Sequence, residues 1–203
     1  MSAGNRALRI WRRGDVSPEE IPGAPEGALV DSARMLEGCG RVAGGLIPQG
    51  HPSGGPFGKR VVWGEGIWPA EMIPVRDTIK LKHDFIRSIV MEPPVRFVVH
   101  SPAGPVSGRV SQPGVRGGLL RALTTDLSKR ASAVRIEADG RLWWVRGVGP
   151  VGARIERAGG ERIFFTRRLH GVFTAHADDL DISVALLAFT AIPSSAYHPV
   201  FGF

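Results

Sequence analysis

The sequence predicts a mainly β protein: an antiparallel β-barrel of hairpins around a hydrophobic C-terminal helix, preceded by an irregular, Gly/Pro-rich N-terminal region. Three observations support this fold class. From residue 77 onward, short segments of strand-forming residues are separated by glycine-containing turns, as in antiparallel hairpins. Residues 182–192 then form an uncharged, apolar segment. The 27 glycines and 16 prolines favour many turns and short elements over long helices.

The first 76 residues have the least regular pattern. Residues 7–13 (ALRIWRR) suit a short strand or a helical turn, and residues 28–42 (ALVDSARMLEGCGRV) suit a helix ended by glycines. The segment 44–60 is rich in Gly and Pro, which is typical of a loop or an extended arm. We therefore expect residues 1–76 to form an arm or extension, with a contribution of strands to the barrel as the alternative.

Residues 77–203 carry the predicted barrel. Alternation over residues 79–85 predicts a strand, and residues 95–110 (VRFVVHSPAGPVSGRV) predict a hairpin. Residues 119–127 suit at most a short connecting helix. The clearest strands follow in AVRIE, LWWVRG, VGARIERA, RIFFTRR and LHGVFTAH, and Asp139-Gly140 is a strong hairpin turn between the first two. Evenly spaced short strands of this kind indicate an antiparallel meander in a barrel or a sandwich.

The apolar segment 182–192 is the most distinctive element of the chain. A membrane-spanning helix needs about 20 apolar residues, and this segment stops at Pro193. A short helix that is apolar on every face is normally buried in protein. Asp181 is a suitable N-cap, with Asp178 and Asp179 in front of it. We therefore predict a helix over residues 182–192 that fills the barrel lumen.

The charge of the chain is strongly basic and uneven. The net charge is +7 and the pI is about 10.6. Residues 1–94 carry 12 Lys and Arg against 11 Asp and Glu, whereas residues 95–203 carry 14 against 8. A basic C-terminal half suits nucleic acid, an anionic membrane surface or an acidic protein partner. The alternative is an arginine-rich composition without a binding role, because arginine far outnumbers lysine.

Cysteine content and the N-terminal sequence bear on the cellular compartment. The single cysteine, Cys39, excludes an intrachain disulfide and a cysteine-based metal cluster. This suits a reducing compartment, and the first 20 residues show no apolar signal-peptide core. We expect a cytoplasmic protein, with peripheral attachment to the membrane as a further expectation.

Residues 77–200 resemble, in pattern, the tubby-like barrel superfamily, in particular its LURP-one-related and phospholipid scramblase-like proteins. Residues 79–112 look like the first hairpins of that family, residues 134–165 like its central hairpins, and residues 170–192 like its last strand and its C-terminal helix. The resemblance implies a barrel of about twelve strands, so some strands would have to come from the N-terminal half. It also implies a non-enzymatic module, because some members bind phosphoinositide headgroups or sit on membranes.

No motif for catalysis or for a cofactor is complete. Residues 54–60 (GGPFGKR) lack the first glycine and the final Ser or Thr of a phosphate-binding loop, and the serine of residues 104–108 (GPVSG) is misplaced for a nucleophile elbow. The histidines form no metal-binding pair. Residues 176–181 (HADDLD) lie where scramblase-like members bind calcium, but they lack a full calcium loop and suit helix capping better. We expect no catalytic residue, no cofactor and no metal.

Arginines beside aromatic residues are the remaining candidates for a site. Strand alternation sends one member of Trp143-Trp144 and of Phe164-Phe165 inward, so a core with a solvated arginine face is the simplest interpretation. The alternative is a basic patch for phosphate groups. The candidate anion- or lipid-binding residues are Arg167, Arg168, Arg146 and Arg162.

These observations leave three hypotheses for function. The first is a non-enzymatic binding module whose basic face meets anionic lipid headgroups or an acidic protein partner. The second is a structural subunit of a larger assembly, held by the N-terminal arm. The third is a nucleic-acid-binding protein, since bases stack on aromatic residues beside arginine.

Overall fold

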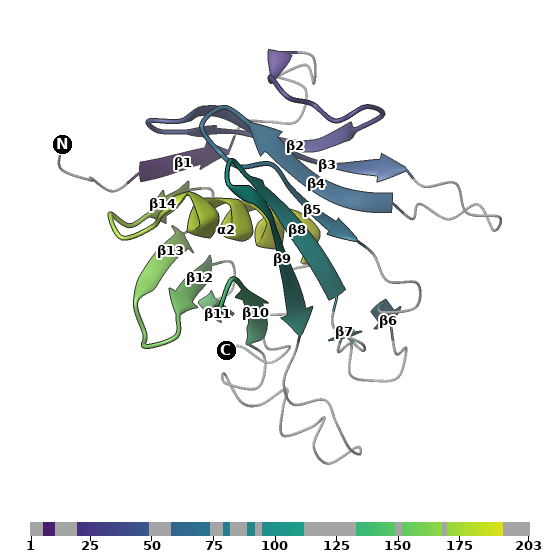
Figure 1. Cartoon of the computed structure of the whole chain (residues 1–203). Helices are drawn as coiled ribbons and strands as arrows, with labels where there is room; N and C mark the ends of the chain where they lie inside the picture. Colours follow the sequence, from purple (N-terminus) through teal and green to yellow (C-terminus); the bar gives the residue numbers. More distant parts are fainter. Residues whose placement is uncertain are drawn as a thin grey trace.

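The computed structural model describes residues 6–10, 20–48, 58–73, 79–81, 89–91, 95–111, 133–148, 152–167 and 170–192. Twelve antiparallel strands close into a barrel in the order β1-β14-β13-β12-β11-β10-β9-β8-β5-β4-β3-β2, and β2 pairs back with β1 (Figure 1). Helix α2 (Asp179–Ala191) lies inside this barrel (Figure 1). The predicted fold class, an antiparallel barrel around a hydrophobic C-terminal helix, is therefore confirmed.

Five of the twelve strands come from the first 76 residues. They are β1 (Arg6–Ile10), β2 (Leu29–Leu36), β3 (Gly40–Pro48), β4 (Gly58–Gly64) and β5 (Ala70–Ile73). The predicted helix over residues 28–42 is wrong, because this segment is a hairpin of β2 and β3. Gly38 and Gly40 have positive φ values of 78° and 116°, so the glycines that were expected to end a helix instead turn the chain between two strands.

The remaining barrel strands follow the predicted hairpins. They are β8 (Val95–Ser101), β9 (Gly104–Ser111), β10 (Val134–Ala138), β11 (Arg141–Val148), β12 (Gly152–Arg157), β13 (Arg162–Arg167) and β14 (His170–Phe173). Asp139 and Gly140 both have positive φ, at 50° and 68°, which gives the predicted tight turn between β10 and β11.

Of the strand predicted over residues 79–85, the structure describes residues 79–81, and these lie in a sheet separate from the barrel. β6 (Ile79–Leu81) pairs with β7 (Ile89–Met91) in a separate two-stranded sheet. The expected connection over residues 119–127 lies outside the described residues.

Helix α2 (Asp179–Ala191) begins three residues earlier than predicted, and its N-cap is Asp178, not Asp181. The two carboxylates form a capping box: Asp178 accepts a hydrogen bond from the Asp181 backbone N–H at 3.0 Å, and Asp181 accepts one from the Asp178 N–H at 2.8 Å. Every residue from Leu180 to Ala188 is buried, so the helix contacts protein on all sides as expected.

The inner and outer faces of the barrel have different cores. The inner core joins α2 to inward side chains of the strands, among them Phe97, Trp143 and Phe164. A second cluster lies on the outer face of β2, β3 and β4, where Ile21 packs with Trp63 and its neighbours Ala33, Ala43 and Val61. This side of the barrel is thus buried on both faces.

Candidate anion-binding face

The outer face of β8 to β13 carries a set of arginines that we call the arginine face. Inward positions on these strands are apolar and buried, for example Val95, Phe97 and Val99 on β8, so the alternate residues point outward. Antiparallel pairing brings these outward residues from six adjacent strands into one surface. The arginine face consists of Arg96, Arg109, Arg135, Arg146, Arg154 and Arg162.

Two arginine pairs lie directly opposite each other on neighbouring strands. Arg96 pairs in register with Arg109, and Arg146 with Arg154. Like charges at directly opposite positions destabilise a sheet. The arginine face therefore depends on nearby carboxylates for compensation, and two glutamates supply them.

Glu137 on β10 is the first of these carboxylates. It forms ion pairs with Arg109 on β9 and with Arg135 on its own strand. The hydrogen bond from Arg109 lowers the pKa of Glu137 from its ordinary value; partial burial opposes this, and the positive charge of Arg135 reinforces it. Glu137 is therefore ionised at neutral pH.

Glu156 on β12 plays the same part on the other half of the face. Its carboxylate lies 3.5 Å from Nη1 of Arg146 and 3.3 Å from Nε of Arg154. Each glutamate thus sits between two arginines. The face as a whole retains six arginines against two glutamates, so it stays strongly positive.

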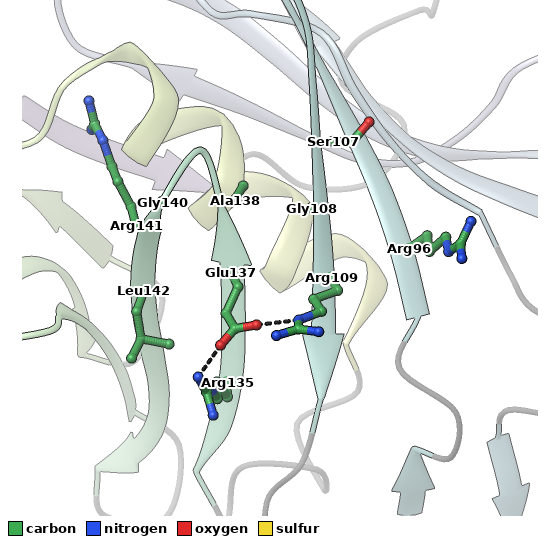
Figure 2. Close-up of a pocket in the computed structure, with 10 residues that line it drawn as sticks. All are labelled: Arg96, Ser107, Gly108, Arg109, Arg135, Glu137, Ala138, Gly140, Arg141 and Leu142. Atoms are coloured by element: carbon green, nitrogen blue, oxygen red, sulfur yellow. Dashed lines mark hydrogen bonds and ion pairs between the residues drawn. The ribbon is translucent and has the colours of Figure 1, made fainter.

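A groove of about 580 Å³ lies over β8 to β11, beside the turn at residues 139–140. Figure 2 shows Glu137 joined to Arg109 and Arg135, with Arg96 on the neighbouring strand. Glu137 is the only acidic residue among the groove-lining residues that the structure describes. These residues are Arg96, Ser107, Gly108, Arg109, Arg135, Glu137, Ala138, Gly140, Arg141 and Leu142.

Two aromatic rings lie among the arginines. The guanidinium of Arg146 stands over the Trp144 ring, and that of Arg162 over the Phe165 ring, each at 5.9 Å from the ring centroid. This is the distance range of cation–π contact. The rings orient the arginines at the β11–β13 end of the face.

The structure brings two of the four predicted site residues into the arginine face. Arg146 and Arg162 belong to it, each paired with an aromatic ring. Arg167 is the last residue of β13 and pairs in register with His170. Arg168 lies outside the described residues.

Sequence inspection missed Arg96, Arg109, Arg135 and Arg154. None of these four is adjacent in the chain to the aromatic pairs Trp143-Trp144 and Phe164-Phe165, and strand pairing brings them together. A period-two count of arginines along each predicted strand would have placed them on one face, and the hairpin turn at residues 139–140 would have aligned Arg135 with Trp144.

A second cluster of charges lies at the start of α2, inside one end of the barrel. Trp143 Nε1 donates a hydrogen bond to Asp181 Oδ1 at 2.8 Å, and Arg157 Nε donates to the same oxygen at 3.2 Å. Arg141 pairs with Asp178. The hydrogen bond to Asp181 raises the pKa of Arg157 despite partial burial.

Asp178 responds to the same cluster. Burial alone would raise the pKa of its carboxyl, but hydrogen bonds from the Asp181 backbone N–H and from Arg141 outweigh this and lower it. Within residues 176–181, Asp178 and Asp181 thus take part in helix capping and ion pairs, as the sequence predicted for this segment. Among the residues that the structure describes, no group of three His, Cys, Asp or Glu is placed to hold a metal ion.

Cys39 is a half-buried free thiol that accepts a hydrogen bond from Arg6 Nη1 at 3.4 Å. In the part of the chain that the structure describes, no helix has the length and apolar character to cross a membrane.

Comparisons with protein-family models, with curated proteins and with solved structures find no match to this chain.

Proposed function

We propose that this protein is a non-enzymatic binding module of the tubby-like barrel type, and that its arginine face docks on anionic lipid headgroups at a membrane surface. The observation that carries the proposal is the convergence of six arginines from six adjacent strands on one outer face. Juxtaposed basic residues contribute about 1 kcal/mol each to binding of an anionic membrane surface. The twelve-strand barrel around a helix supports the family part of the proposal.

The asymmetry of the barrel supports this choice of surface. On β2 to β4 the outer face is covered by the cluster around Ile21 and Trp63. On β8 to β13 the outer face keeps exposed arginines, including Arg96 and Arg162. The arginines line about half of the outer wall of the barrel, and the positive charge of this wall selects for anionic lipid over neutral lipid.

Vesicle co-sedimentation tests the proposal. The purified protein should sediment with vesicles containing phosphatidylglycerol and stay in solution with vesicles of phosphatidylcholine alone. Binding should weaken as salt rises, because the Debye length shrinks to about 8 Å at physiological ionic strength. Equal binding to both kinds of vesicle would overturn the proposal.

Charge-removal variants assign the binding to the arginine face. The double variant Arg96→Gln/Arg162→Gln should weaken binding by on the order of tenfold or more, at about 1 kcal/mol per arginine. Arg41→Gln/Arg60→Gln is the matched two-charge control, because Arg41 of β3 and Arg60 of β4 are half-exposed, lie outside the arginine face and pair with Glu20 and Asp31. Equal losses in the double variant and in two-charge controls outside the face would contradict a localised site.

The same purified protein can be tested for two other kinds of partner, an acidic protein and a single-stranded nucleic acid. If the protein does not bind vesicles but binds an acidic protein in a salt-sensitive manner, the arginine face binds a protein partner. If it shifts single-stranded DNA or RNA in a gel at low salt, the stacking of Arg146 on Trp144 gains a nucleic-acid role.

A further inference from the structure

We propose that Glu137 is a resident anion of the arginine groove, and that a phosphate monoester binds there by displacing its carboxylate from Arg109 and Arg135. This inference rests on the proposed function, because it assumes that the arginine face meets anionic ligands. It adds the class of ligand, and it adds that a ligand must carry more negative charge than the carboxylate of Glu137.

The geometry places Glu137 where a ligand anion would bind. Its carboxylate bridges arginines of two adjacent strands, Arg109 on β9 and Arg135 on β10 (Figure 2). It is the sole carboxylate in the described lining of the groove. A phosphate group that bridged the same two guanidinium groups would replace both ion pairs at once.

The groove has cationic capacity beyond what Glu137 uses. Arg96 lines it and has no ion pair with a described residue. Nε of Arg135 is buried and has no hydrogen-bond partner among the described residues, although the same guanidinium pairs with Glu137 through Nη2. Buried donors in folded proteins are normally satisfied. One carboxylate therefore does not balance Arg96, Arg109 and Arg135 together.

The resident carboxylate sets the charge that a ligand needs. Glu137 carries one negative charge and is tethered, so its effective concentration at the two arginines is high. A phosphodiester also carries one charge and has no advantage over it. A phosphate monoester carries about −1.5 to −2 and offers three acceptor oxygens. Three oxygens are enough to accept hydrogen bonds from Arg109, Arg135 and Arg96, and the side chain of Glu137 that they would displace is 18% exposed.

Glu156 provides a matched control on the same surface. It also bridges two arginines, Arg146 and Arg154, but it does not line the groove. Glu156→Gln and Glu137→Gln thus make the same change in net charge on the same face. Only Glu137→Gln removes a negative charge from the groove.

The experiment compares vesicles containing phosphatidic acid, a monoester, with vesicles containing phosphatidylglycerol, a diester, at matched surface potential. The wild-type protein should prefer phosphatidic acid by on the order of tenfold, given the extra charge of the monoester. Glu137→Gln should raise binding to phosphatidylglycerol more than binding to phosphatidic acid. The preference for phosphatidic acid should then fall to within about twofold. Glu156→Gln should raise binding to both lipids by a similar factor, about fivefold for one charge, and keep the preference.

A soluble arm separates a lipid headgroup from a free phosphate compound. Glycerol 3-phosphate should compete with phosphatidic acid vesicles for the wild-type protein, whereas dimethyl phosphate should compete only in Glu137→Gln. If Glu137→Gln and Glu156→Gln change the binding of both lipids by the same factor, the inference about Glu137 fails while the membrane proposal stands. If no vesicle binds but glycerol 3-phosphate binds and the preference depends on Glu137, the membrane proposal fails and the inference holds for a soluble ligand. Thermal unfolding of both variants confirms that they fold alike.

Discussion

Trp143 on β11 donates its indole N–H to Oδ1 of Asp181 at 2.8 Å, and this hydrogen bond ties a barrel strand to the first turn of the buried helix. Asp181 is 1% exposed and also pairs with Arg157 of β12. A buried carboxylate is stable only when it is paired and hydrogen-bonded. The geometry therefore fixes both the depth and the rotation of α2 within the barrel.

Replacing Asp181 with alanine should destabilise the protein by about 3 kcal/mol, because it leaves Arg157 and the Trp143 N–H without their main partner. Urea unfolding followed by Trp fluorescence measures the change. Asp179→Asn, at an exposed position in the same turn, should cost less than about 1 kcal/mol, the value of a helix-dipole interaction. Similar costs for the two variants would refute the anchoring role of Asp181.

The capping carboxylate of Asp178 should make stability depend on acidic pH. Its pKa is lowered in the folded protein, so the stabilisation is present in full above its ordinary pKa of 3.8 and is lost as the pH falls through the lower folded-state pKa. The free energy of unfolding of the wild type and of Asp178→Asn should therefore converge as the pH is lowered. Parallel curves over the acidic range would show that Asp178 contributes no such linkage.

Gly44 on β3 lets the barrel wall approach the helix. A Cβ atom at this position would lie 2.5 Å from Oγ1 and 2.7 Å from Cγ2 of Thr190 on α2. We expect Gly44→Ala to destabilise the protein by about 1–3 kcal/mol through overpacking. Thr190→Ala removes both atoms, so the double variant should recover part of this loss in a double-mutant cycle. Additive costs would mean that the two residues do not contact.

Ile21 covers the outer face of the barrel over Trp63. Its truncation in Ile21→Ala should cost about 3 kcal/mol, as for other fully buried large-to-small changes. Leu29→Ala on β2 is the control, since Leu29 is 58% exposed and its truncation should have little effect. A small effect of Ile21→Ala would show that the segment before β2 adds little to stability.

The sequence predicted the strands in which local chemistry and tertiary packing agree. Asp139-Gly140 requires a tight turn, and the apolar residues of β10 and β11 alternate around it, so this hairpin was predictable. The helix was predictable because no charge interrupts residues 182–192. Its start was misplaced because Asp178 and Asp181 are both good capping residues, and only their mutual hydrogen bonds decide between them.

The errors arose where two faces of a strand are buried. Residues 29–36 show no simple alternation, because Ala33 packs in the outer cluster and Leu36 in the inner core. Their spacing resembles that of a helix. Only two of the six arginines of the arginine face were predicted, for a related reason: Arg109 and Arg135 lie on strands that residues 112–133 separate in the chain, and strand register is a tertiary property.

The position of α2 in the chain has a consequence for synthesis. All twelve barrel strands leave the ribosome before the helix that fills them, so a nascent barrel wall exposes Phe97, Trp143 and Phe164 until α2 is synthesised. Closure also joins β1 to β14, the first and last strands, which is a contact of high sequence separation and slow to form. Chains interrupted before residue 179 should therefore accumulate as aggregates or as chaperone clients instead of as partly active folds.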